Sequence, residues 1–143
     1  MNSSLLACFG NSIHQAIVQM FIIIILITII TAHIVTQNYT KNFFNEISNE
    51  LQNIQDNIYS GNVKSDDLTD NINNVKEKWD EKYSVCACYI EHDELEKVQT
   101  QLVSIKANIE TEEYDKCIEN IESCKFILQH IEDKDSFKFI NIF

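Results

Sequence analysis

The sequence predicts an all-α protein with one N-terminal transmembrane helix, followed by an antiparallel helical bundle or hairpins of three to four amphipathic helices. The chain contains no proline and only two glycines, so little interrupts long helices. One continuous apolar segment lies near the N-terminus, and the apolar residues after it recur at spacings of three and four. This spacing is the helical period, and it favours helices over strands.

Charge divides the chain into two parts. The first 40 residues carry no charged side chain, whereas the remainder holds all 11 lysines and all 22 acidic residues, which gives a net charge of -11. Arginine is absent. Nucleic acids and anionic membrane surfaces are both bound by clustered basic side chains. The composition therefore argues against either as a ligand.

The apolar segment is predicted to span a membrane. Residues 16–35 read AIVQMFIIIILITIITAHIV, and about 20 residues at about 1.5 Å each cross a hydrocarbon core of about 30 Å. A cleaved signal peptide has a basic start and a small-x-small cleavage site, and neither occurs before Lys41. We expect an uncharged extension over residues 1–15, an uncleaved signal anchor over 16–36 and an acidic helical domain over 41–143. A start at Met20 instead of Met1 stays open.

Four apolar stripes at helical spacing follow the membrane segment. They are Phe44, Ile47, Leu51, Ile54 and Ile58; Leu68, Ile72, Val75, Trp79, Tyr83 or Val85, and Cys86; Leu95, Val98, Leu102, Ile105 and Ile109; and Tyr114, Cys117 or Ile118, Ile121, Cys124 or Phe126, Leu128 and Ile131. Each stripe predicts a helix that packs on its neighbours. We expect Trp79, Leu95, Leu102 and Leu128 in the core, with Trp79 as its large central residue.

Polar residues between the stripes predict the helix ends. Gly61 suits a left-handed C-terminal position, and Ser65, Asp93 and Thr111 are each typical N-cap residues for the helix that follows. Helices three and four should form an antiparallel hairpin because their connection is short. This arrangement predicts that His92, at the start of helix three, lies near Gln129 and His130, at the end of helix four. There, His130 can interact with the negative C-terminal end of its own helix.

The final segment, SFKFINIF, places Phe137, Ile140 and Phe143 at helical spacing. We expect it to fold back and close the bundle.

The stretch CACYIEHDE, residues 86–94, contains two thiols, an imidazole and three carboxylates. Zinc sites usually present Cys-x2-Cys pairs, whereas Cys86 and Cys88 are two apart and point about 200° apart on a helix. We expect Cys86, Cys88, Cys117 and Cys124 to behave as small buried apolar residues. In an oxidising compartment Cys86 or Cys88 could approach Cys124, although the sequence does not establish a pairing. The remaining candidates for a metal site are His92, Asp93, Glu94 and His130.

Catalysis is not the favoured interpretation of the same residues. His92 with Asp93 and Glu94 has acid-base components, but a slim bundle offers little volume for an enclosed pocket. No phosphate-binding glycine loop and no nucleophile or zinc-protease motif occurs. We expect these residues to stabilise the start of a helix, and we expect no enzyme activity and no cofactor.

A set of short motifs resembles a known family. The set is the N-terminal membrane helix, Trp79, HDEL at residues 92–95, KFILQHI at residues 125–131 and NIF at residues 141–143. It is similar to small membrane-anchored proteins of Gram-positive, spore-forming bacteria, the family of domain of unknown function 4363, from about Met20 to the last residue. The resemblance implies a helical body outside the cytoplasmic membrane, no established activity, and a multi-spanning membrane protein as partner. The positive-inside rule, with only Lys41 flanking the segment, favours the opposite orientation.

The sequence suggests two functions. The first is a non-enzymatic, single-pass membrane protein whose helical body binds a protein partner, as an accessory subunit of a membrane protein. The alternative is a small ligand- or metal-sensing module outside the membrane that uses the end of the hairpin bearing His92 and His130.

Overall fold

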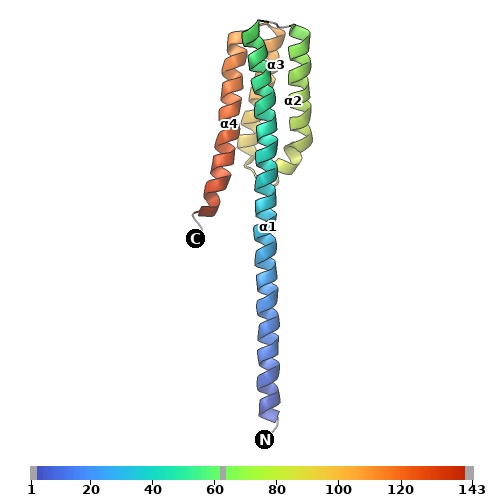
Figure 1. Ribbon diagram of the computed structural model, residues 1–143, viewed down its shortest axis with the longest axis vertical. Coiled ribbons are helices and arrows are strands. Elements are labelled where there is room, and N and C mark those ends of the chain that lie inside the picture. Colours follow the sequence, from blue (N-terminus) through green and yellow to red (C-terminus); the bar gives the residue numbers. More distant parts are fainter. Residues whose placement is uncertain (1–2, 62–63, 141–143) are drawn as a thin grey trace. The chain divides into compact units, whose positions relative to one another are not determined.

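The computed structural model describes the backbone of residues 3–61 and 64–140, and the side chains of residues 14–61 and 64–134. Four α-helices occur in these residues: α1 (Ser3–Ser60), α2 (Ser65–Cys86), α3 (His92–Glu110) and α4 (Tyr114–Ile140) (Figure 1). No strand is present in these ranges. The predicted all-α class is confirmed.

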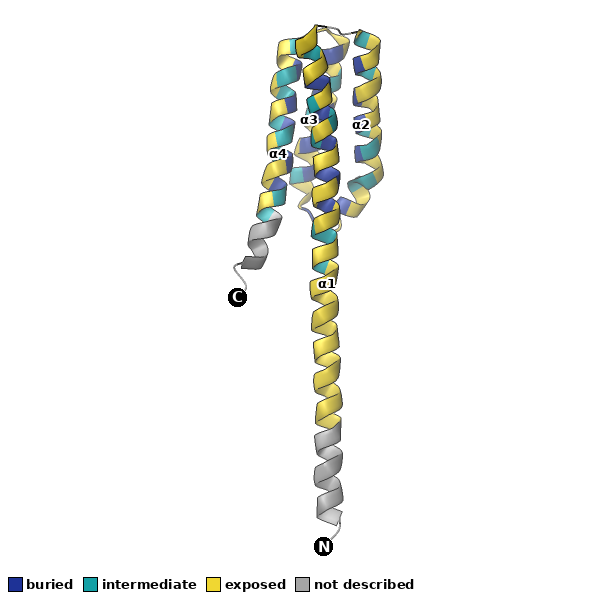
Figure 2. Cartoon of the chain, viewed as in Figure 1, coloured by how far each residue is buried: buried dark blue, intermediate teal, exposed yellow. Residues whose placement is uncertain are grey.

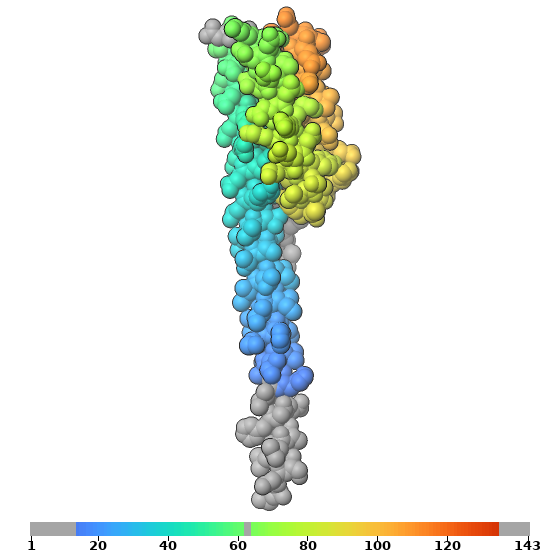
Figure 3. Space-filling view, turned by 90° about the vertical axis from the view of Figure 1, so that its right-hand side faces the viewer, coloured from blue at the N-terminus to red at the C-terminus, as the bar shows by residue number. Residues whose placement is uncertain are grey.

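The chain divides into two units, residues 1–38 and residues 39–143. In the first unit, the large apolar side chains between Ile17 and Val35 are exposed (Figure 2), with exposed fractions from 42% at Ile30 to 62% at Val35. In Figure 3 this segment is drawn in blue, and the face turned toward the viewer consists of side chains of the segment itself. By length and composition α1 can cross a membrane.

The second unit is an antiparallel four-helix bundle formed by residues 39–60 of α1 with α2, α3 and α4. Lys78 of α2 pairs with Glu46, at 2.6 Å, and with Glu50, both on α1. Lys125 of α4 reaches Gln52 of α1, with 2.5 Å between Nζ and Oε1. Helix α3 packs on both α2 and α4. Each helix therefore contacts two neighbours and turns its apolar stripe inward.

Aromatic residues of α1 and α2 fill one end of the core of the bundle. Trp79 exposes 1% of its surface and stacks on Phe43, with ring centroids 5.8 Å apart, and on Phe44, at 6.2 Å. Further along the bundle, aliphatic side chains continue the core, and Leu95, Leu102 and Leu128 are buried. The predicted core residues thus all lie inside. Figure 3 shows α2, in green, on the face of the bundle that is turned toward the viewer.

The helix ends differ from the sequence prediction at three positions. Gly61 has the expected left-handed conformation, with a φ of 65°. The residue before α2 is Lys64 and the residue before α3 is Glu91; both are extended, and neither makes a capping hydrogen bond through its side chain. Ser65 and Asp93 lie inside the first turns, so their predicted capping roles are wrong. Because a first-turn carboxylate still complements the helix dipole, Asp93 keeps a stabilising position.

The prediction that Thr111 caps the start of α4 is also wrong. It follows the last residue of α3, and its hydroxyl donates to the Ala107 carbonyl oxygen at 2.9 Å. Glu112 then adopts a φ of 57° and turns the chain toward α4. The hydroxyl therefore completes α3 instead of capping α4.

Helix α4 continues to Ile140. His130 lies ten residues before that end, outside the last turn, where the helix dipole acts. The predicted dipole role of His130 is wrong for this reason. The expectation that the segment SFKFINIF folds back is wrong up to Ile140, because residues 136–140 continue α4. The expected packing of Phe137, Ile140 and Phe143 concerns side chains outside the described residues.

Candidate functional site

The stretch CACYIEHDE, residues 86–94, forms the junction between α2 and α3. Helix α2 ends at Cys86, and the amides of Ala87 and Ile90 donate to the carbonyl oxygens of Tyr83 and Cys86, each at 2.9 Å. Ile90 is buried and fixes this turn against the core. The stretch CACYIEHDE is therefore a tight connection between two helices.

His92 points toward α2 and its own helix. Its Nδ1 lies 3.3 Å from the Tyr83 hydroxyl, with the two rings 5.8 Å apart at 75°, and its Nε2 lies 3.2 Å from a Glu96 carboxylate oxygen. The His92 side chain is 64% exposed. Tyr83, His92 and Glu96 carry groups that can exchange protons, but they lie on an open surface with no enclosure for a substrate.

A partly buried hydrogen-bonded chain lies on the inner side of the same junction. The Thr40 hydroxyl donates to the Tyr89 hydroxyl oxygen at 2.9 Å, and Tyr89 donates to the Cys86 sulfur at 3.8 Å. Burial raises the pKa of Tyr89 to about 12, and burial also raises the pKa of the Cys86 thiol. Both groups are therefore protonated at neutral pH, and the chain acts as a structural tie between α1 and the junction.

The four cysteines in the described part of the chain are free thiols. Burial raises the pKa of Cys117 to about 11 and that of Cys124 to about 12, which leaves both thiols unreactive at neutral pH. Cys88 is exposed, so the prediction that all four are buried is wrong at this position. The physical reason is that α2 stops at Cys86, and Cys88 falls in the turn outside the buried stripe.

The α3–α4 hairpin is antiparallel as predicted, but a different residue makes the contact at its open end. Lys134 of α4 lies 2.8 Å from Glu91 and 3.7 Å from Glu94 at the start of α3. His130 instead stacks on Phe126 of its own helix, with ring centroids 6.4 Å apart at 14°. Within the described side chains, no hydrogen bond, ion pair or ring contact joins His92 to His130.

The metal-site candidates do not form a ligand set. Across residues 14–61 and 64–134, no group of three or more His, Cys, Asp or Glu side chains could hold a metal ion. His92, Asp93 and Glu94 follow one another on one helix turn and diverge around it. The junction is thus a helix connection whose polar groups pair with neighbouring side chains.

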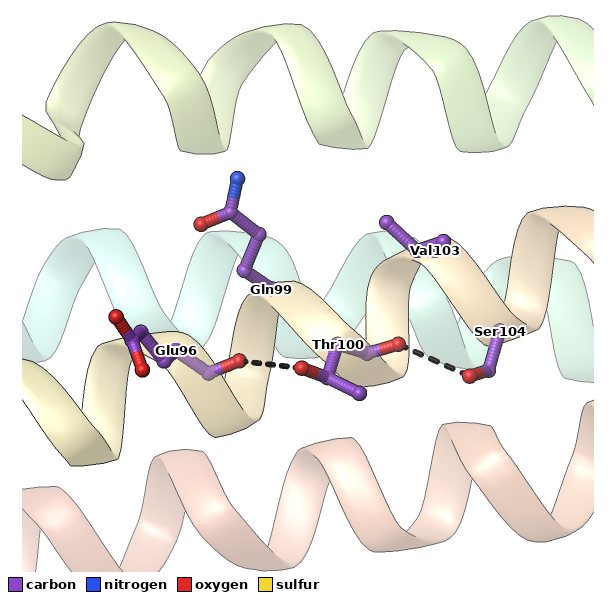
Figure 4. A pocket seen from close by; sticks show the side chains of 5 residues that line it. All are labelled: Glu96, Gln99, Thr100, Val103 and Ser104. Atoms are coloured by element: carbon purple, nitrogen blue, oxygen red, sulfur yellow. Dashed lines mark hydrogen bonds between the residues drawn. The ribbon is translucent and has the colours of Figure 1, made fainter.

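Open grooves lie on the surface of the bundle in the part of the chain that the structure describes. One, of about 460 Å³, lies on the outer face of α3 and is lined by Glu96, Gln99, Thr100, Val103 and Ser104 (Figure 4). The hydroxyls of Thr100 and Ser104 donate to the carbonyls of Glu96 and Thr100, so they add little polarity to this face. The other, of about 340 Å³, lies between α1 and α2 and is lined by Glu50, Asn53, Asn71 and Asn74. Neither groove holds a convergent catalytic set.

Sequence reasoning missed the Thr40–Tyr89–Cys86 chain. Thr40 is 4% exposed and lies four residues before Phe44, so it continues the first buried stripe. A polar residue in phase with an apolar stripe is the signal that could have identified it, because such a group needs a buried partner. Tyr89 could not be identified in this way, since it belongs to the turn.

Fold and site define an all-helical protein in which one helix is long and apolar enough to span a membrane and the rest form a filled bundle. Residues 34–142 match the protein family described as Domain of unknown function (DUF4363), and the chain belongs to this family. The predicted family is thus confirmed, over a range that begins at residue 34 and not at Met20. No curated protein and no solved structure matches the chain.

Proposed function

We propose that the chain is a single-pass, membrane-anchored, non-enzymatic protein whose helical body binds a protein partner, as an accessory subunit of a membrane protein. The observation that carries this proposal is the exposed apolar surface between Ile17 and Val35. An apolar surface of this extent is stable in a bilayer and unfavourable in water. The filled core and the open grooves of the body support a binding role over catalysis.

The groove on α3 is the surface we would test first for the partner. Val103 exposes 52% of its surface there, and Glu96 links the groove to the His92 side of the junction. A photo-crosslinking residue at Val103, introduced into the full chain in native membranes, should give a specific adduct with one membrane protein. Tyr59, which is 68% exposed on α1, provides a matched control position. Equal labelling of many proteins at both positions would argue against a defined partner surface.

The body is proposed to face the outside of the cell. Cys88 is a natural probe of this orientation because its thiol is exposed whereas Cys86, Cys117 and Cys124 are buried. The test uses a chain in which Cys8 is replaced by Ser, so that Cys8 cannot react with the label. A membrane-impermeant maleimide added to intact cells that express this chain should label Cys88. A further Cys88→Ser substitution should abolish the labelling. Labelling only after cell lysis would place the body in the cytoplasm, as the single flanking residue Lys41 would favour.

A further inference from the structure

One side of α4 carries an exposed aromatic ring next to acidic residues. We call this surface the α4 outer face, and its residues follow one another at spacings of three and four: Asp115, Glu119, Glu122, Phe126 and His130. Residues at this spacing lie on the same side of a helix, and all five are exposed. Phe126 exposes 73% of its surface, a larger fraction than any other large apolar side chain in the part of the chain described. The ring is therefore available to a binding partner.

The contacts of two lysines show that this face is turned away from the bundle. On a helix, residue 125 points about 100° to one side of Phe126, and residue 134 points about 80° to the other side. Lys125 reaches Gln52 of α1, with 2.5 Å between Nζ and Oε1. Lys134 lies 2.8 Å from Glu91, the residue before α3. Because α1 and α3 lie on these two sides, the face between them is not covered by either helix.

The charge of the α4 outer face favours a cationic partner. Its carboxylates lie on the N-terminal side of the ring, and none of its positions is a lysine: Asp115, Glu119 and Glu122. Lys125 lies 3.2 Å from Glu122 and offsets that one charge. Lys116 pairs at 2.8 Å with Glu113, which is outside the face. The face thus keeps a negative charge that a basic partner complements.

The ring of Phe126 suits a cation as well. It stacks on His130, with ring centroids 6.4 Å apart at 14°, and most of its surface stays exposed. A lysine or arginine side chain is attracted to the face of an aromatic ring within about 6 Å of its centroid. The bundle itself contains such a contact, because Lys82 Nζ lies 5.8 Å from the centroid of the Tyr39 ring. A cation on Phe126 also lies one helical turn from the Glu122 carboxylate.

We propose, building on the proposed binding of a protein partner, that the α4 outer face docks a basic helical segment of that partner. Lysine or arginine side chains of the segment pair with Glu119 and Glu122, and one lies over the Phe126 ring. A helix with basic residues three and four positions apart matches the spacing of this face. A second copy of this chain, with a net charge of -11, has the wrong sign of charge to dock here.

Binding of a synthetic peptide to the full chain in uncharged detergent tests this proposal. The probe is a fluorescent helical peptide of about 18 residues, or about five turns, made of alanine, leucine and lysine, with the lysines along one side. The control peptide has glutamate in place of lysine. Fluorescence anisotropy should show that the lysine peptide binds at least about tenfold more tightly than the glutamate peptide. This binding should weaken as salt is added.

Two matched pairs of variants separate the α4 outer face from the overall charge of the chain. Phe126→Ala removes a ring that is 73% exposed, and Tyr59→Ala removes one that is 68% exposed on α1. Glu119→Gln and Glu77→Gln each remove one carboxylate, the second at an exposed position on α2. Phe126→Ala and Glu119→Gln should each raise the Kd of the lysine peptide about threefold. The two control variants should leave it unchanged.

Equal effects of Glu119→Gln and Glu77→Gln, or an unchanged Kd for Phe126→Ala, would overturn the docking face. Photo-crosslinking from Val103 in native membranes is run in parallel to separate the two proposals. A specific adduct from Val103, together with no preference for the lysine peptide, contradicts docking on α4 alone. Loss of both the adduct and the peptide binding contradicts the partner binding on which this docking rests.

Discussion

In the first unit of the chain, Ile22 to Ile25 expose between 49% and 57% of their surfaces, whereas Ile47, Ile54 and Ile72 in the bundle expose none. The residue type is the same, and its spacing differs. Isoleucines in an unbroken run cover every side of a helix, so no single neighbour can bury them. Isoleucines three or four residues apart occupy one side, which a neighbouring helix covers. Spacing therefore decides whether neighbouring helices can bury the apolar side chains of a helix.

The largest effect is expected from removing the central residue of the bundle. Trp79→Ala should lower the free energy of unfolding by about 3–5 kcal/mol, because it leaves a cavity between α1 and α2. The measurement is helical circular dichroism of the full chain in detergent as denaturant is added. Phe126→Ala is the control: this ring is 73% exposed, and its loss should change stability by about 0.5 kcal/mol or less. Equal losses for the two variants would contradict the assignment of the core.

A charge in the apolar segment of the first unit should disturb its insertion into the membrane. Ile25→Asp should make insertion less favourable by about 3 kcal/mol, because an ionised carboxylate near the middle of the bilayer is poorly solvated. We expect a shift of the full chain from the membrane to the soluble fraction, measured by fractionation of cells. Val103→Asp places the same charge on the exposed face of α3 and should leave the distribution unchanged. A similar shift for both variants would indicate that folding, not insertion, was impaired.

The partly buried chain of Thr40, Tyr89 and Cys86 predicts an intermediate effect that depends on pH. The pKa of Tyr89 is raised by burial to about 12 from an ordinary value of 10.0. A raised pKa favours the protonated form in the folded state, so this stabilisation is complete below pH 10 and is lost as the pH rises toward 12. Tyrosinate absorbance should therefore show one late-titrating group that is absent in Tyr89→Phe.

The same variant removes the hydrogen bonds that Tyr89 makes with Thr40 and Cys86. Tyr89→Phe should lower the free energy of unfolding at neutral pH by about 1–2 kcal/mol. Tyr59→Phe, at an exposed position on α1, is the matched control. An unchanged stability of Tyr89→Phe would show that the tie does not hold α1 to the junction.

The smallest effect is expected at the open end of the α3–α4 hairpin. Lys134→Gln removes the ion pairs with Glu91 and Glu94 at the surface, where pairs of this kind contribute little. The midpoint of thermal unfolding should fall slightly at low salt and not at all at high salt, because salt screens exposed charges. A large decrease that persists in high salt would mean that this contact, and not the core, holds the hairpin together.

Sequence alone predicted the helical class, the four stripes and the core positions, because each depends on local spacing. It did not predict the helix starts at Ser65 and His92, because the preceding residues, Lys64 and Glu91, adopt the required extended conformation without a capping side chain. A search for capping side chains cannot detect such a start.

The candidate site was less predictable than the fold. The tie between Thr40 and Tyr89 joins residues 49 positions apart, and their meeting depends on how α1 is aligned with the junction. The same limit explains why Lys134, and not His130, contacts the start of α3. A hairpin predicted from sequence defines which ends meet, but not which turn of α4 faces Glu91.

The proposed membrane anchoring requires that the apolar segment of α1 crosses a membrane. Alkaline carbonate extraction of membranes from cells that express the full chain tests this claim most directly, since it releases peripheral proteins and retains inserted ones. If the segment is inserted, the chain stays in the membrane pellet and is dissolved only by detergent. Release of the chain into the carbonate supernatant would contradict it.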